Sequence, residues 1–162
     1  MKKHLVLALA GVVFVFWGCA GMGPASKNVQ REFTYDYVIN GKSKSELWKN
    51  ARNYFAEAYG DSRAVFRIMD EQDGTIIGKG TVSWKLFDSC YTDYHVRFAA
   101  KDNKARLQFE LIEGVPPLSP CTGWAWPTQS GYDEIVAKFN ATSKELENAL
   151  MGKGSSSKLK NF

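Results

Sequence analysis

The sequence predicts an α+β fold in which an antiparallel sheet of about five strands is covered by two helices. In five short segments, apolar and polar residues alternate, which is typical of strands with one buried and one solvated face. In two longer segments, apolar residues recur at helical spacing, so each segment has one stripe that must be buried. The predicted order is β-α-β-β-β-β-α.

The first strand covers residues 33–39 (FTYDYVI), and Asn40-Gly41 forms the turn after it. The first helix begins at a capping box, with Ser43 as the N-cap and Glu46 three residues later. Gly60 is placed to end this helix. The apolar stripe of the helix consists of Leu47, Trp48, Ala51, Tyr54, Phe55, Ala58 and Tyr59.

Four further strands complete the predicted sheet. They cover residues 64–69, 75–84, 91–101 and 105–112. Gly78 and Gly80 lie on the apolar face of the third strand of the chain. Glycine at such positions predicts a bulky neighbour packed closely on the strand, and we expect this neighbour to be the first helix.

A long irregular segment, 113–129, separates the sheet from the second helix and holds four of the five prolines. Ser130, with Asp133 three residues later, is the predicted N-cap of the second helix. The apolar stripe of this helix consists of Tyr132, Ile135, Val136, Phe139, Leu146, Ala149 and Leu150. The helix should end at Gly152, and residues 152–162 read as a disordered polar tail.

Three stretches carry a resemblance to a known family: the helix SKSELWKNARNYFAEAYG, the strand AVFRIM and the run GTIIGKGTV. They resemble a family of bacterial lipoprotein domains of unknown function with a TATA-binding-protein-like (TBP-like) fold. The resemblance covers about residues 33–112. It implies a curved antiparallel sheet with the helices packed on one face, and it implies no activity or cofactor. A resemblance to a DNA-binding fold does not by itself bring DNA binding.

The first nineteen residues predict a lipoprotein signal. Lys2 and Lys3 give a positive start, residues 5–17 carry no charge, and Cys19 stands at the junction. We expect residues 1–18 to be removed as a signal peptide and Cys19 to be acylated. Two alternatives stay open, an uncleaved membrane helix and a secreted chain, because the Phe16-Trp17 pair is bulky for a cleavage site.

The mature chain is expected to have a tether, one domain and a tail. Residues 19–31 read as the lipidated cysteine and a flexible tether, and residues 32–151 as a single domain. Loss of Lys2 and Lys3 lowers the net charge from +4 to +2, which is too small to favour nucleic acid as a partner. The expected location is the cell envelope, on the outer membrane facing the periplasm if the host is Gram-negative.

Cysteine usage agrees with export. If Cys19 carries lipid, Cys90 and Cys121 are left, and an oxidising compartment favours a disulfide between them. For a loop of this size the chain-entropy argument gives a stabilisation of roughly 3–4 kcal/mol. The alternative is two buried free thiols.

Trp124 and Trp126 are the candidate partner-binding residues, since two rings at alternate positions of an extended loop can face the same way. The alternative is that both rings belong to the core. His95 is the single histidine after the signal, and Ser83 on the neighbouring strand is the one nucleophile considered beside it. We expect an exposed structural histidine, no catalytic residue, no metal site and no cofactor.

The sequence thus predicts a lipid-anchored envelope protein that binds a protein or glycan partner and is not an enzyme. Two alternatives remain. One is a small hydrolase-like envelope enzyme that uses an exposed strand face. The other is a structural or regulatory lipoprotein that interferes with an envelope receptor.

Overall fold

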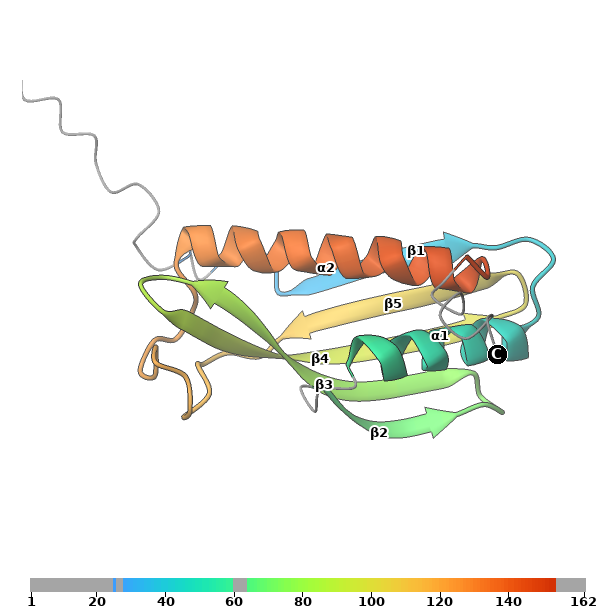
Figure 1. The fold of residues 1–162 in the computed structure, drawn as a ribbon, viewed down its shortest axis with the longest axis horizontal. Helices are drawn as coiled ribbons and strands as arrows, with labels where there is room; N and C mark the ends of the chain where they lie inside the picture. Colours follow the sequence, from blue (N-terminus) through green and yellow to red (C-terminus); the bar gives the residue numbers. More distant parts are fainter. Residues whose placement is uncertain (1–24, 26–27, 60–63, 154–162) are drawn as a thin grey trace, which may run out of the picture.

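A computed structural model describes residues 25, 28–59 and 64–153 as one sheet covered on one face by two helices (Figure 1). The elements are β1 (Glu32–Val38), α1 (Lys44–Ala58), β2 (Ala64–Asp70), β3 (Thr75–Lys85), β4 (Ser89–Lys101), β5 (Lys104–Leu111) and α2 (Gln129–Leu150). All neighbouring strands are antiparallel, in the order β1-β5-β4-β3-β2. The predicted fold class and element order are confirmed.

The two edge strands differ in how far they reach. β1 pairs along its whole length with β5. β2 pairs only with the first half of β3, from Thr75 to Gly80. Residues 81–85 of β3 therefore pair with β4 on one side and have no described strand on the other. This open edge becomes part of the candidate site described below.

The start of α1 is as predicted. The backbone N–H of Glu46 donates to Ser43 Oγ at 3.3 Å, and the backbone N–H of Ser43 donates to Glu46 Oε2 at 3.0 Å. Both members of the capping box are thus satisfied, which stabilises the first turn. The predicted stop at Gly60 lies outside the described residues.

The start of α2 corrects the prediction, because the N-cap is Thr128 and not Ser130. The backbone N–H of Gly131 donates to Thr128 Oγ1 at 3.1 Å, so the helix begins two residues earlier than the Ser130-Asp133 spacing indicated. Close packing explains why residue 131 is glycine. A Cβ at this position would overlap the indole ring of Trp84, so glycine lets the first turn of α2 lie directly on that fully buried side chain.

The core fills the space between the helices and the inner face of the sheet. Alternate residues of β4 and β5 point into it as predicted, including Val96, Phe98, Leu107 and Phe109. Phe109 stacks on Phe139 of α2 with ring centroids 4.3 Å apart. Aromatic pairs of this kind add to the area they bury, so the contact fixes α2 on the sheet.

Glycine in β3 serves a purpose different from the one expected. A Cβ at Gly80 would overlap the phenol ring of Tyr94, its cross-strand partner in β4. The bulky neighbour is therefore a strand residue, and the expectation that the first helix packs against Gly80 is wrong. The ring of Tyr94 lies over the glycine because there is no side chain to displace it.

Part of the expected tether is packed on the domain. Ala25 is 5% exposed and its N–H donates to Pro127 O at 2.8 Å. Gln30 O accepts a hydrogen bond from the hydroxyl of Tyr132, and Arg31 O accepts one from the N–H of Leu111. The prediction of a flexible tether is corrected for residues 25 and 28–31.

Several predictions lie outside the described residues. They are the signal peptide 1–18, Cys19, most of the tether before residue 28, and the tail from residue 154. Within the described ranges, neither helix is long and apolar enough to cross a membrane.

Candidate functional site

The loop that contains the predicted tryptophan site is held on the end of the sheet by a disulfide. Cys90 at the start of β4 and Cys121 in the loop are bonded, with their Cα atoms 5.5 Å apart. The predicted pairing is confirmed. Next to it, the backbone N–H of Tyr91 donates to Ser119 Oγ at 3.1 Å. The loop is therefore attached to β4 by a covalent bond and a hydrogen bond.

The two tryptophans do not form a shared exposed face. Trp126 is 3% exposed, and the guanidinium of Arg31 lies 4.4 Å from the centre of its ring. Trp124 is half-buried and packs against the core cluster. The interpretation of Trp126 as a binding residue is corrected, because a ring covered by the core and by Arg31 cannot reach a partner.

The proposed pair of His95 and Ser83 is not brought together. His95 lies opposite Lys79 of β3 and Glu110 of β5 on the outer face of the sheet. Ser83 is four residues further along β3 than Lys79, about 13 Å at strand rise. Ser83 instead contacts Lys138 of α2.

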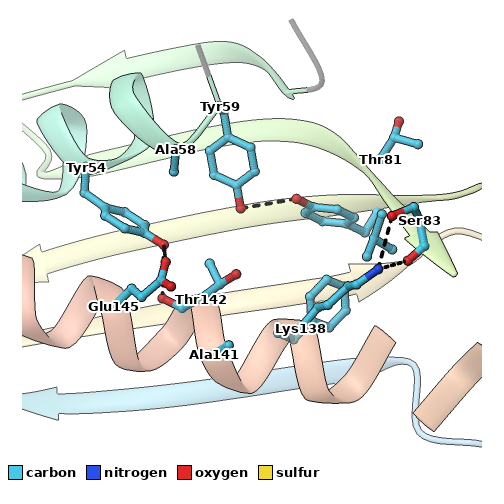
Figure 2. Close-up of a pocket in the computed structure, with 12 residues that line it drawn as sticks. Tyr54, Ala58, Tyr59, Thr81, Ser83, Lys138, Ala141, Thr142 and Glu145 are labelled. Carbon is cyan, nitrogen blue, oxygen red and sulfur yellow. Dashed lines mark hydrogen bonds between the residues drawn. The ribbon is translucent and has the colours of Figure 1, made fainter. Parts of the chain in front are cut away.

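The structure shows a groove that the sequence did not indicate. It lies where α1 and α2 diverge over the open edge of β3, and has a volume of about 420 Å³ (Figure 2). Side chains from both helices and from β3 and β4 line it. The polar members are Tyr54, Tyr59, Thr81, Ser83, Tyr94, Lys138, Thr142 and Glu145.

Tyr94 forms the floor of the groove, in the position that Gly80 makes available. Its hydroxyl donates to the hydroxyl oxygen of Tyr59 at 3.2 Å, which joins β4 to the end of α1 (Figure 2). Each hydroxyl oxygen in such a pair retains hydrogen-bonding capacity toward a third group. The floor therefore presents a polar centre between aromatic rings.

One wall of the groove is a contact between the two helices. The hydroxyl of Tyr54 donates to Glu145 Oε2 at 3.1 Å and lies 3.3 Å from Thr142 O. Figure 2 shows the side chain of Tyr54 reaching from α1 to Glu145 and Thr142 of α2. The carboxylate of Glu145 is exposed and retains acceptor capacity.

The opposite wall is formed by side chains that satisfy the open edge of β3. The ammonium of Lys138 donates to Ser83 O and, at 3.1 Å, to Ser83 Oγ. The same ammonium pairs with Glu134 Oε1 at 2.8 Å, and Glu134 Oε2 accepts from the backbone N–H of Lys85 at 3.0 Å. Two residues of α2 thus take the place of a strand neighbour along residues 83–85.

Electrostatics keep the groove close to neutral. Burial raises the pKa values of Tyr54, Tyr59 and Tyr94, so all three phenols stay protonated at physiological pH. The hydrogen bond from Lys138 lowers the pKa of Glu134, so this carboxylate is ionised at physiological pH. The groove offers neutral hydroxyls, one compensated cation and the carboxylate of Glu145.

The groove brings one serine and one lysine together. Ser83 Oγ and Lys138 Nζ are close enough for a serine–lysine nucleophile, but a lysine used as a base must be neutral. Lys138 Nζ is instead paired with Glu134 Oε1 at 2.8 Å. Among the described residues no group of three or more His, Cys, Asp or Glu side chains could hold a metal ion.

Comparison with known proteins gives a family match and two similar folds. Residues 33–113 match the family described as "Domain of unknown function (DUF4468) with TBP-like fold". A TBP-like protein from Parabacteroides distasonis is similar in structure, with a TM-score of 0.55 and 14% identity over 72% of this chain and 92% of that chain. A DUF4468 family protein from Bacteroides ovatus has a TM-score of 0.54 and 12% identity over 85% of this chain and 94% of that chain. No curated protein matches the chain.

Proposed function

The chain belongs to the DUF4468 family of domains of unknown function with a TBP-like fold, and from that premise we propose that it is a lipid-anchored cell-envelope protein with a binding domain. The domain binds a partner through the groove between α1, α2 and the edge of β3. It carries out no chemistry. The partner is a glycan of the envelope.

The groove is the observation that carries this proposal. Its volume of about 420 Å³ is within the range of about 300–1,000 Å³ usual for small-ligand sites. It combines the half-buried rings of Tyr54 and Tyr59 with hydroxyl, ammonium and carboxylate groups. Aromatic rings with polar groups at their edges suit a ligand that has both apolar faces and hydroxyls. A sugar ring has this character.

The charges of the residues that line the groove favour a glycan over a strongly charged ligand. Among the described residues that line the groove, Glu145 is the one exposed carboxylate and Lys138 is the one cation, which is compensated by Glu134. A strongly anionic ligand would meet that carboxylate and a cation that already has a partner. A neutral or weakly charged saccharide meets hydrogen-bonding groups of both kinds.

The outer face of the sheet supports the exclusion of nucleic acid. Three of its cations are paired with carboxylates of neighbouring strands, in the pairs Asp36–Arg106, Lys79–Asp93 and Arg97–Glu110. A surface that binds nucleic acid needs an excess of unpaired positive charge to release counterions. The same fold in a DNA-binding protein is no argument for this chain.

The lipid anchor rests on the signal-like first nineteen residues and on cysteine usage. The chain has three cysteines, and two of them form the disulfide. Cys19 is the remaining one, at the junction where acylation of a lipoprotein occurs. A disulfide also suits an oxidising compartment outside the cytoplasm.

Binding can be tested on the groove without disturbing the fold. Ala141 of α2 is exposed and lines the groove, whereas Ala137, one turn earlier on the same helix, is exposed and does not line it. Ala141→Arg fills the opening of the groove, and Ala137→Arg is the matched control. The probe is the soluble disaccharide repeat of peptidoglycan, titrated into the mature protein in detergent and followed by calorimetry.

We expect Ala141→Arg to raise the Kd at least tenfold and Ala137→Arg to leave it unchanged. If the wild-type protein does not bind the disaccharide, a photocrosslinker at position 141 in cells decides between two outcomes. Capture of an envelope protein would retain the binding function and replace the glycan. No capture, together with no saccharide binding, would refute the groove as a binding site.

A further inference from the structure

We propose that one end of the domain contacts the lipid bilayer directly. The contact consists of Phe87, in the turn between β3 and β4, and Leu118, in the loop 113–128. This inference rests on the proposed lipid anchor at Cys19. It adds a second, reversible attachment to the covalent one and gives the domain a fixed orientation on the membrane.

Phe87 and Leu118 are almost fully exposed, at 90% and 97%. Single exposed apolar residues are common and need no explanation. Here, however, both lie close to the same disulfide. Phe87 is three residues before Cys90, and Leu118 is three residues before Cys121. Figure 1 shows the β3–β4 turn and the loop at the same end of the molecule.

The segments that carry Phe87 and Leu118 are held in place. The Cys90–Cys121 bond and the hydrogen bond from Tyr91 N–H to Ser119 Oγ tie the loop to β4. The hydroxyl of Thr122 donates to Ser119 O at 2.6 Å, which closes the loop on itself. An apolar side chain on a rigid support loses little conformational entropy when it enters a bilayer.

The loop and the turn themselves carry very little charge. Residues 114–132 contain no Asp, Glu, Lys or Arg, and Asp88 is the one charged residue in the turn 86–89. Charged groups oppose transfer into the hydrocarbon region, so an uncharged loop lowers the barrier to contact. Trp124 lies in this loop and is half-buried, and tryptophan is enriched at the membrane–water interface.

The chain reaches the domain at this same end. The backbone N–H of Ala25 donates a hydrogen bond to Pro127 O at the base of the loop. Six peptide units separate Ala25 from Cys19. Six residues span at most about 20 Å. β4 alone, with thirteen residues, is about 40 Å long. A lipid on Cys19 therefore places the bilayer at the loop end of the sheet and not at the far end.

This orientation also determines how far the groove lies from the membrane surface. α2 begins at the loop end and its groove residues start at Lys138, nine residues along the helix. At 1.5 Å per residue, the groove lies roughly 15–25 Å from that end. The bilayer contact thus holds the binding groove clear of the lipid surface.

The test uses the acylated full-length product reconstituted in phosphatidylethanolamine–phosphatidylglycerol vesicles. Phe87→Cys and Leu118→Cys each introduce one thiol for a nitroxide label, since Cys90 and Cys121 are bridged. Val38→Cys is the matched control, because Val38 is apolar, 76% exposed and at the opposite end of β1. Accessibility to oxygen is compared with accessibility to a water-soluble nickel complex.

We expect labels at 87 and 118 to favour oxygen and the label at 38 to favour the nickel complex. Independently, Phe87→Ser with Leu118→Ser should speed transfer of the protein between vesicles at least tenfold, and Val38→Ser should not. Intact mass of the same sample separates the two proposals. An acylated protein with water-exposed labels and unchanged transfer overturns the bilayer contact alone, whereas a protein without acyl groups overturns the anchor and, with it, this inference.

Discussion

At the scale of single residues, tryptophan illustrates how burial decides function. Trp84 is fully buried, its indole N–H donates to Thr92 Oγ1 at 3.0 Å, and Gly131 packs on its ring. Trp126 is also in the core, with Arg31 over its ring. Trp124 alone among these three is partly accessible. The identity of the residue did not distinguish these environments, because all three contribute the same large apolar ring.

The difference between Trp124 and Trp126 gives a stability prediction. Trp126→Ala should lower the free energy of unfolding by about 3–5 kcal/mol, as is typical when a buried aromatic is truncated. Trp124→Ala should lower it by about 1 kcal/mol, because the ring is half-exposed and loses less buried area. Urea denaturation of both variants measures this. Equal losses for the two variants would contradict the placement of Trp126 in the core.

At the scale of elements, alternation and capping patterns predicted most of what the structure contains. The faces of β4 and β5 and the capping box of α1 follow from local sequence, since each depends on residues a few positions apart. The Ser130-Asp133 spacing predicts a start of α2 that is two residues too late. Ser130 and Thr128 are both good caps, and the choice of Thr128 depends on the packing of Gly131 against Trp84, which lies on another element.

The capping box of α1 predicts a pH dependence. Hydrogen bonds from the backbone N–H and hydroxyl of Ser43 lower the pKa of Glu46 to about 2, from 4.5. Because the folded-state pKa is the lower one, this contribution to stability is present above pH 4.5 and is lost as the pH falls toward 2. Glu46→Gln should therefore flatten the dependence of the urea midpoint on pH between about 4.5 and 2.

Glu57→Gln is the matched control for this experiment, since Glu57 is exposed on the same helix and lies outside the capping box. It should leave the slope of the wild-type protein unchanged. An identical slope for wild type and Glu46→Gln would mean that the carboxylate of Glu46 does not hold the helix start in solution.

Local sequence patterns do not predict the groove, because its residues come from several elements. The helical spacing predicts Tyr54 and Tyr59 as members of the apolar stripe of α1, and no sequence motif marks Lys138. Their meeting depends on the arrangement of two helices and on the start of β2, which begins at Ala64 opposite Gly80 and leaves residues 81–85 of β3 without a described strand neighbour on that side. One signal was present in the sequence. Tyrosine in place of leucine or phenylalanine at two stripe positions indicates a boundary where hydroxyls need polar partners.

At the scale of the whole molecule, the parts have a common orientation. The disulfide-linked loop, the start of α2 and the entry of the chain at Ala25 lie at one end of the sheet, and the groove lies further along α2. The overall architecture was predictable because five alternating segments and two amphipathic ones have few ways to bury their apolar faces. The sequence could not indicate the end that we propose faces the membrane, since this depends on where residues 25 and 28–31 pack.

The central claim is that the chain acts as an acylated, disulfide-bonded protein of the cell envelope. The most direct test is the intact mass of the product isolated from membranes of cells that express the full sequence. The account predicts a chain that begins at Cys19, carries fatty acyl groups there, and lacks the two thiol hydrogens of Cys90 and Cys121. A full-length product of unmodified mass, dissolved in the cytosol with both thiols reactive, would contradict it.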